Sequence, residues 1–180
     1  MKLYFVTCNQ NKVKEFQSIL KNHEVEQVAI DYPELRSDDP EEIAKLAAKQ
    51  LADILNKPIV VEDSGLFINS LNDFPGTCSA YIHKRIGLKG ILKLMKGVKD
   101  RSCQYRSAVA YCEPNKEPFS FLGTEKGIIA QKPRGKYGFG HDPIFIPEKS
   151  RKTYGEMEDV KEKKRFRRKA VLKLMKFLKQ

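Results

Sequence analysis

The stretch DPEEIAKLAAKQLADILNKPIVVEDSGLFI, residues 39–68, decides the fold. Its first half predicts a helix, because Asp39 is a favourable N-cap residue and Pro40 fits the first helical turn. Apolar residues then recur at helical spacing, which predicts one buried face. This stripe consists of Ile43, Ala47, Leu51 and Ile54. Asn56 and Pro58 end the helix, since Asn tolerates a left-handed cap and Pro cannot continue the helical hydrogen bonding.

The second half of the stretch predicts two short strands, residues 58–61 and 66–68, separated by a turn at Ser64-Gly65. The alternation of strands and helices continues outward in both directions. We expect further strands over residues 2–7, 25–30, 102–112, 119–129 and 144–146, and helices over residues 12–21 and 82–96. Helices alternate with strands early and adjacent strands follow, so the pattern predicts an α/β fold with a mixed sheet.

Composition is that of one ordinary globular domain over residues 1–180, with 41% hydrophobic residues. No apolar run approaches the roughly 20 residues that a membrane span needs, and the N-terminus is too short for a signal peptide. Four cysteines lack the CxxC spacing of a zinc site. Reduced thiols in a cytoplasmic protein are therefore expected.

The net charge of +11 is concentrated at one end of the chain. Residues 161–180 contain ten Lys or Arg and one acid, a balance of +9. Apolar residues recur there at helical spacing, which predicts an amphipathic helix with a basic outer face. They are Phe166, Ala170, Val171, Leu174, Phe177 and Leu178. The basic face is either a solvated surface or an electrostatic trap for polyanions, nucleotides or nucleic acid.

Polar residues follow the first predicted strand and precede the first helix. Unpaired N–H groups and a partial positive charge at a helix N-terminus bind phosphate readily. Thr7 and Asn9 could add side-chain donors, and Lys12 a full positive charge. The alternative is that Asn9 simply caps the helix.

Two further loops carry candidate chemistry. Glu62 and Asp63 follow an apolar strand, where adjacent carboxylates repel one another unless a cation such as Mg2+ lies between them. The alternative is an exposed acidic turn.

Residues 135–143 hold three glycines among aromatic residues, which would let the backbone approach a flat ligand while Phe139 stacks on it. A structural hairpin loop explains this segment equally well.

Taken together, these loops resemble one family, the inosine triphosphate pyrophosphatases, along the whole chain. The N-terminal signature Thr-Gly-Asn-x-x-Lys-x-x-Glu stands here as Thr7-Cys8-Asn9-Gln10-Asn11-Lys12-Val13-Lys14-Glu15. The other matching segments are Glu62-Asp63-Ser64-Gly65-Leu66, Phe74-Pro75-Gly76, Ser79-Ala80, Gly138-Phe139-Gly140-His141-Asp142-Pro143-Ile144-Phe145 and Glu156-Met157. These segments form four motifs: the N-terminal signature, the central acidic motif with the two segments after it, the glycine-aromatic signature and the Glu-Met pair. Their order and spacing are those of the family, which makes the match specific.

The resemblance implies Mg2+-dependent hydrolysis of ITP, XTP and dITP to the monophosphate and pyrophosphate. It also implies an elongated, two-lobed α/β fold with the active-site cleft between the lobes, and a homodimer. Asp63 would bind metal and act as general base, with Glu34 and Glu62 supporting the metal. Substrate contacts would come from Thr7, Cys8, Asn9, Gln10, Asn11, Lys12, Ser64, Phe139, Gly140, His141, Asp142, Arg167 and either Lys161 or Lys163.

Three departures from the family pattern matter. Cys8 replaces the usual glycine, and Arg165-Phe166-Arg167 replaces Ser-His-Arg, so the base-contacting histidine is missing. A lysine usual in the second helix falls nearest Leu46 or Ala47. A related triphosphatase for another modified nucleotide therefore remains an alternative. A basic nucleic-acid-binding module is a more distant one, because acids balance bases outside the terminal segment; no stable nucleic-acid or membrane partner is expected.

Overall fold

The computed structural model describes residues 2–20 and 23–179. Lys21, the expected end of the first helix, and Gln180 lie outside the described residues. The elements are β1 (Lys2–Val6), α1 (Gln10–Ile19), β2 (Glu24–Val28), α2 (Pro40–Leu55), β3 (Ile59–Ile68), η1 (Asn69–Leu71), β4 (Pro75–Gly76), α3 (Ser79–Leu94), β5 (Ser102–Cys112), β6 (Phe119–Ile129), η2 (Asp142–Ile144), β7 (Phe145–Pro147), η3 (Tyr154–Glu156), α4 (Val160–Lys163) and α5 (Arg165–Phe177).

The strands form one seven-stranded mixed sheet. Its order is β2-β1-β3-β5-β6-β7, and β4 pairs with β3 outside this path. Strand β1 lies parallel to β2 and to β3, whereas β4 is antiparallel to β3 and β7 is antiparallel to β6. The α/β class with a mixed sheet, predicted from the alternation of elements, is confirmed.

The chain divides into two compact units. Unit 1 comprises residues 1–63, 107–123 and 166–180, and unit 2 comprises residues 64–106 and 124–165. Strands β3, β5 and β6 each contribute residues to both units. That the whole chain acts as one domain stays a prediction.

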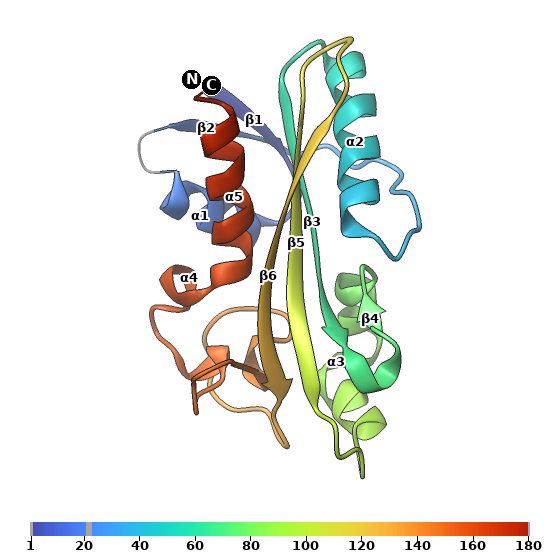
Figure 1. Ribbon diagram of the computed structural model, residues 1–180, viewed down its shortest axis with the longest axis vertical. Coiled ribbons are helices and arrows are strands. Elements are labelled where there is room, and N and C mark those ends of the chain that lie inside the picture. Colours follow the sequence, from blue (N-terminus) through green and yellow to red (C-terminus); the bar gives the residue numbers. More distant parts are fainter. Residues whose placement is uncertain (1, 21–22, 180) are drawn as a thin grey trace. The chain divides into compact units, whose positions relative to one another are not determined.

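In unit 1 the sheet is covered by helices on both faces, with α1 and α5 on one face and α2 on the other (Figure 1). Successive residues of a strand point to opposite faces, and the two cores follow that rule. Leu3, Phe5, Val60, Val109 and Tyr111 pack with α1 and α5. Their neighbours Val6, Ile59, Val61, Ala108, Ala110 and Cys112 pack with α2. Both faces are buried, so these strands read as almost continuous apolar runs.

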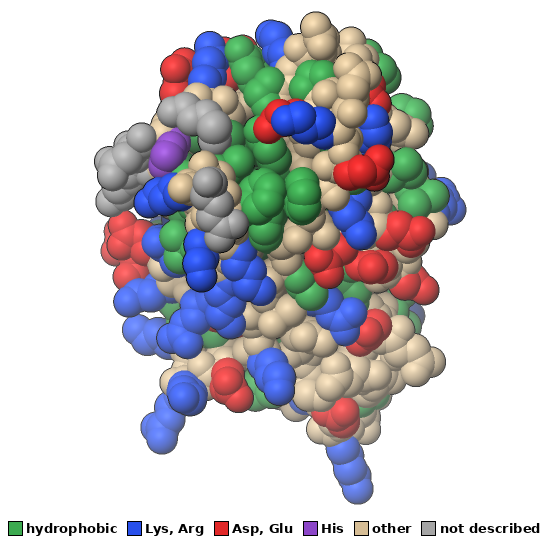
Figure 2. Space-filling view, turned by 45° about the horizontal axis from the view of Figure 1, so that its top comes forward, with side chains coloured by type: hydrophobic (Ala, Val, Ile, Leu, Met, Phe, Trp, Pro, Cys, Tyr) green, Lys and Arg blue, Asp and Glu red, His purple; other side chains and the backbone are tan. Residues whose placement is uncertain are grey.

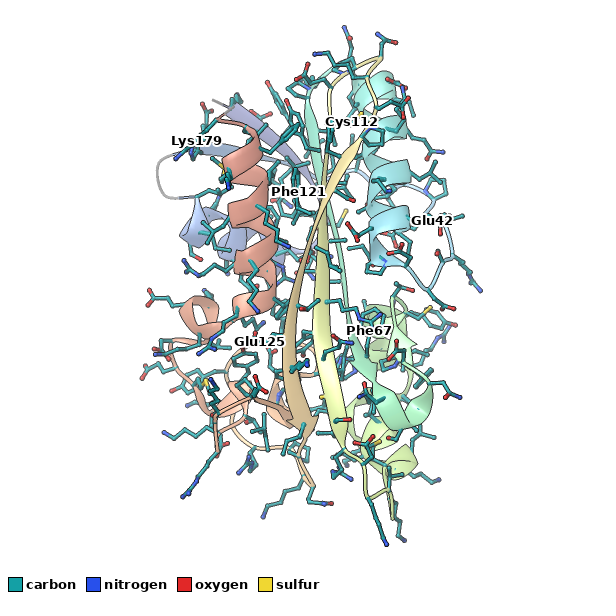
Figure 3. The ribbon with its side chains drawn as sticks, viewed as in Figure 1. Glu42, Phe67, Cys112, Phe121, Glu125 and Lys179 are labelled. Atoms are coloured by element: carbon teal, nitrogen blue, oxygen red, sulfur yellow. The ribbon has the colours of Figure 1, made fainter. Side chains whose placement is uncertain are left out.

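Helix α5 lies close to strand β6. A Cβ atom added to Gly123 would lie 1.9 Å from the carbonyl oxygen of Phe166, so only glycine allows this approach. Phe121 points from β6 toward α5 (Figure 3), and its ring centroid lies 5.5 Å from that of Phe177. The amphipathic helix predicted near the C-terminus is thus docked through its apolar face.

Helix α2 begins as predicted. The Asp39 side chain accepts a hydrogen bond from the Glu41 N–H at 2.9 Å, and Pro40 is the first helical residue. Asn56 ends the helix in the left-handed conformation, with φ of 51°. Both termini follow from local side-chain chemistry.

Unit 2 packs around an aromatic row. The ring centroids of Tyr105 and Phe145 are 4.4 Å apart, and those of Phe145 and Tyr154 are 5.4 Å apart. Helix α3 contains a kink at Gly87, whose φ of 59° is not helical. Glu125, labelled in Figure 3, is buried on β6 and accepts a hydrogen bond from the Arg165 N–H at 2.8 Å.

One prediction of secondary structure is wrong. Residues 59–68 form the single strand β3 rather than two strands with a turn at Ser64-Gly65. Gly65 instead allows strand β4 to approach β3 closely, since a Cβ added to Gly65 would lie 1.9 Å from the Gly76 carbonyl oxygen. A glycine inside a strand can mark such an approach as well as a turn, and here strand β4 supplies the neighbour.

None of the helices in the described part of the chain is long and apolar enough to cross a membrane.

Candidate active site

The loop between β1 and α1 is organised by its own side chains. Asn9 caps α1, because its Oδ1 accepts hydrogen bonds from the N–H groups of Asn11 at 3.0 Å and Lys12 at 3.3 Å. The Thr7 hydroxyl oxygen accepts a hydrogen bond from the Asn9 N–H at 3.1 Å. The capping role considered for Asn9 is therefore present. It fixes the first turn of α1, whose partial positive charge favours an anion.

Lys12 extends from this loop to strand β3. Its ammonium donates to the Glu62 backbone carbonyl at 2.9 Å and lies 2.8 Å from Glu62 Oε2. The Lys12 side chain keeps 18% exposure, whereas the Glu62 side chain has none. These two contacts fix the Lys12 ammonium beside Glu62, the residue that precedes Asp63 in the sequence.

Glu62 is the centre of a buried polar network in unit 1. Its Oε1 accepts a hydrogen bond from the Ser107 hydroxyl at 2.5 Å and another from Arg167 Nε at 3.0 Å. Arg167 is itself buried, and its Nη1 atom pairs with Glu15 on α1. Burying charge is costly unless each group is paired, and here two carboxylates face two cations.

Opposing effects act on the pKa of Glu62. Burial alone would raise this pKa, but the charges of Arg167 and Lys12 and the hydrogen bonds from Lys12 and Ser107 outweigh burial and lower the pKa to about 2. Burial would likewise lower the pKa of Arg167, and the carboxylates of Glu62 and Glu15 raise it instead. Both groups are therefore charged at neutral pH.

Asp63 and Glu34 belong to the same acidic surroundings, near Tyr32. Burial raises the pKa of the Tyr32 hydroxyl, and the negative charges of Glu34, Asp63 and Glu62 raise it further. Glu34 is exposed, and Asp63 is half-buried with its Oδ2 atom buried. Within residues 2–20 and 23–179, no group of three or more His, Cys, Asp or Glu is arranged as a metal site by the protein alone.

The glycine-aromatic loop of unit 2 is held by Asp142. Asp142 Oδ2 accepts a hydrogen bond from the Phe139 N–H at 2.7 Å, and Oδ1 accepts one from the Tyr105 hydroxyl at 3.3 Å. A Cβ on Gly138, whose φ is 75°, would lie 2.2 Å from Asp142 Oδ2. Glycine is required at this position both by the positive φ and by the close approach of the carboxylate.

His141 is buried in the same loop, with 3% exposure, and its ring makes an edge contact with His83. Burial and, to a smaller extent, the charge of His83 together lower the pKa of His141 to about 4. The imidazole is neutral at pH 7 and offers one donor and one acceptor. Its Nε2 atom has no hydrogen-bond partner among the residues described.

The remaining predicted contacts lie in different surroundings. Cys8 is exposed, and the side chain of Gln10 donates to Gln27 at 2.9 Å. Lys161 and Lys163 are both exposed, and Lys163 lies 3.4 Å from Asp159. Neither lysine approaches the described carboxylates of the glycine-aromatic loop.

Sequence reasoning did not single out Glu15, Ser107, Tyr105 or Lys164, all of which contact predicted site residues. Only Glu15 had a signal, since it is the last residue of the N-terminal signature. Lys164 is buried and lies 2.8 Å from Asp142 Oδ2, in contrast to Lys161, expected from its distance to Arg167, and Lys163, expected from its Glu-Lys context.

Fold and site together define an α/β protein in which a capped helix N-terminus, a fixed lysine and several carboxylates gather beside strands β1 and β3. A family model described as the Ham1 family matches residues 3–177. The chain belongs to this family.

Two curated relatives and one solved structure are similar to this chain over most of its length. The dITP/XTP pyrophosphatase of Methanopyrus kandleri is 50% identical over 159 residues, which cover 87% of this chain and 85% of that protein. The dITP/XTP pyrophosphatase of Methanosarcina mazei is 46% identical over 173 residues, which cover 94% and 93%. The Ham1 protein of Staphylococcus aureus has a similar structure, with a TM-score of 0.86, 30% identity and coverage of 99% and 98%.

Proposed function

We propose that this protein hydrolyses the deaminated purine nucleotides ITP, dITP and XTP to the monophosphate and pyrophosphate. Family membership and relatives named dITP/XTP pyrophosphatases support this activity. The observation that carries the proposal is the gathering of Lys12, Glu62 and Arg167, from the beginning, middle and end of the chain, next to Asp63. A polyphosphate requires such fixed cations, because its charge must be neutralised before water can approach phosphorus.

The phosphates are assigned to the loop that precedes α1 and to Lys12. This loop comprises Thr7, Cys8, Asn9, Gln10, Asn11 and Lys12, with Ser64 as a further contact. The N-terminus of α1 supplies a partial positive charge and Lys12 a full one, and the Asn9 cap holds both in place.

Mg2+ is assigned to Asp63 and Glu34. Both carboxylates lie near Tyr32, and hard oxygen donors of this kind fit Mg2+. Mg2+ usually takes only one or two protein carboxylates and keeps water and phosphate oxygens as its other ligands. When bound, the ion would neutralise phosphate charge and acidify a water molecule. Glu62, also expected to support the metal, already accepts from Ser107, Arg167 and Lys12, and these contacts favour a positioning role for it.

Asp63 is the general base in this proposal. It accepts a proton from the attacking water while the new oxygen–phosphorus bond forms at the α-phosphate. The bond from this phosphorus to the bridging oxygen breaks, and pyrophosphate leaves. Lys12 is held by Glu62, the residue that precedes Asp63, and stabilises the negative charge of the phosphates.

Base recognition is assigned to Phe139, Gly140, His141 and Asp142. A 6-oxo purine has an acceptor at C6 and a donor at N1, the reverse of adenine. A site that pairs with this pattern leaves buried groups unpaired with adenine, at a cost of about 1–3 kcal/mol for each mismatch. Buried Phe166 stands where the family has a base-contacting histidine, so a related triphosphatase for another modified base is the second candidate.

We further propose a cytoplasmic homodimer without a stable nucleic-acid partner. The four cysteines are free, as expected in a reducing compartment. Analytical ultracentrifugation tests the dimer, and a monomer at micromolar concentration would argue against it.

The activity is tested by measuring pyrophosphate release from ITP, dITP, XTP, ATP and GTP, with Mg2+ and with excess chelator. We expect release from the three deaminated nucleotides, loss of release in chelator, and far slower release from ATP and GTP. Equal rates with all five nucleotides would contradict the proposed selectivity. No release from any of them would contradict the activity itself.

A further inference from the structure

Lys164 is the one buried lysine among those at positions 161, 163 and 164. It lies at the break between α4 and α5, where its ψ of 118° interrupts the helix. Its exposure is 3%, whereas Lys161 and Lys163 are both exposed. The backbone break therefore turns a side chain of the basic segment inward.

The ammonium of Lys164 contacts two residues of the glycine-aromatic loop. It lies 2.8 Å from Asp142 Oδ2, and the Asp142 side chain is 1% exposed. It also lies 4.0 Å from the centroid of the Phe139 ring, within the range of a cation–π contact. Asp142 Oδ2 accepts the Phe139 N–H as well, so the lysine and the aspartate hold both the ring and the backbone of Phe139.

A buried pair of this kind has a large effect on local geometry. Removal of one partner leaves an uncompensated buried charge, so the two side chains must stay together. The contact occupies one face of the Phe139 ring and limits the ring orientations that are available to it. The Tyr105 hydroxyl also donates a hydrogen bond to Asp142, and this bond holds the carboxylate through its other oxygen, Oδ1.

We propose that Lys164 is a positioning residue that fixes the Phe139 ring and the Asp142 carboxylate for recognition of the purine base. This inference rests on the proposed function, because it assigns a role within the base-recognition loop. Lys164 acts through Phe139 and Asp142, and none of these three residues is assigned to the phosphates in the proposed function. Its loss therefore affects nucleotides that carry a base more than a ligand that has phosphates alone.

The test compares Lys164→Met with Lys152→Met, a matched control that removes an exposed lysine of unit 2. KM and kcat are measured for ITP and ATP, and inorganic tripolyphosphate serves as a competitive inhibitor without a base. For Lys164→Met we expect the KM for ITP to rise about tenfold and the preference for ITP over ATP, as a ratio of kcat/KM, to fall about tenfold. The inhibition constant of tripolyphosphate should stay within about twofold, and Lys152→Met should match the wild type on every measure.

Two kinetic outcomes overturn the inference. One is that Lys164→Met keeps the wild-type KM and preference. The other is that tripolyphosphate binding weakens as much as ITP binding, which would make Lys164 a phosphate ligand. If Lys164→Met does not fold, the double variant Lys164→Met with Asp142→Asn removes both buried charges together. A folded double variant that retains the wild-type preference for ITP also overturns the inference.

The proposed function can fail separately. A wild-type enzyme that releases no pyrophosphate from any triphosphate contradicts the activity, and with it the role in base recognition. The positioning itself is then judged from the NMR signals of 13C-labelled phenylalanine rings. The Phe139 ring signals should shift in Lys164→Met and stay unchanged in Lys152→Met, and unchanged signals in both variants overturn the positioning role.

Discussion

At the scale of the residue, Glu62 is the centre of the buried charge network in unit 1. Lys12, Arg167 and the Ser107 hydroxyl all contact its carboxylate, and the side chain has no exposure. The pair of Glu62 and Arg167 is completed by Glu15, so each buried charge has a partner. This explains why the buried Glu62 is ionised without a metal ion beside it, and it separates the role of Glu62 from that of Asp63.

Replacement of Glu62 by Gln should lower the free energy of unfolding by about 3 kcal/mol, because Arg167 and Lys12 would keep buried charge without full compensation. Urea denaturation followed by circular dichroism measures the change. Glu117→Gln, at an exposed position, is the control and should stay within about 0.5 kcal/mol of the wild type. A loss below about 1 kcal/mol for Glu62→Gln would show that the network contributes little to stability.

The same residue predicts a dependence of stability on pH. The pKa of Glu62 is about 2 in the folded protein against an ordinary value of 4.5, so the unfolded chain binds this proton more readily. The stabilisation, about 3 kcal/mol, is complete above pH 4.5 and is lost as the pH falls through this range toward 2. The difference in unfolding free energy between the wild type and Glu62→Gln should therefore shrink as the pH is lowered from 6 to 3. A difference that stays constant would contradict the assigned charge state.

At the scale of the element, the sequence predicted those features that depend on neighbouring residues. Strands β5 and β6 have the expected bounds, and Asp39 and Pro40 begin α2 as their cap chemistry requires. Contacts between distant residues could not be predicted in this way. Arg167 meets Glu62 from 105 positions away, and only the packing of α5 against the sheet brings them together.

Local reasoning also failed where a backbone detail decides the direction of a side chain. If residues 161–180 formed one continuous helix, nothing would favour Lys164 over Lys161 or Lys163 as the lysine that contacts the site. The break in the helix at Lys164 is what turns this side chain inward. Gly65 matched a turn signal, yet it serves the approach of β4 to β3. Candidate loops could thus be found from their motifs, whereas the partners within them required the fold.

The packing of α5 on β6 gives a prediction at this scale. Gly123→Ala should lower the free energy of unfolding by about 2 kcal/mol, because the added methyl group would overlap the Phe166 carbonyl and displace the helix. Thermal denaturation measures the loss. Lys126→Ala, on the same strand and at an exposed position, is the control. Equal melting temperatures for the two variants would mean that α5 adjusts without cost.

At the scale of the whole molecule, the net charge of +11 has a definite location. On the face in Figure 2, Lys and Arg side chains gather in one area and Asp and Glu side chains gather in another. Residues Lys169, Lys173, Lys176 and Lys179 belong to the exposed part of the terminal segment. A concentration of positive charge attracts anionic ligands at a distance and raises their rate of encounter.

Neutralising Lys169, Lys176 and Lys179 to Gln should lower kcat/KM for ITP about threefold at low ionic strength and leave kcat unchanged, because only the encounter is affected. The effect should disappear at high salt, where such interactions are screened. Neutralising Lys84, Lys89 and Lys93, which are exposed on α3, is the control of equal charge. An equal effect of both triple variants would mean that net charge matters and its location does not.

The most direct test compares Mg2+-dependent pyrophosphate release from ITP by the wild type and by Asp63→Asn. Asn keeps the size of the side chain but cannot accept the proton from water, so we expect release to fall at least about a thousandfold. The melting temperature should stay close to that of the wild type. Undiminished release by a folded Asp63→Asn enzyme would contradict the assignment of the acidic centre as the place where the phosphate bond is broken.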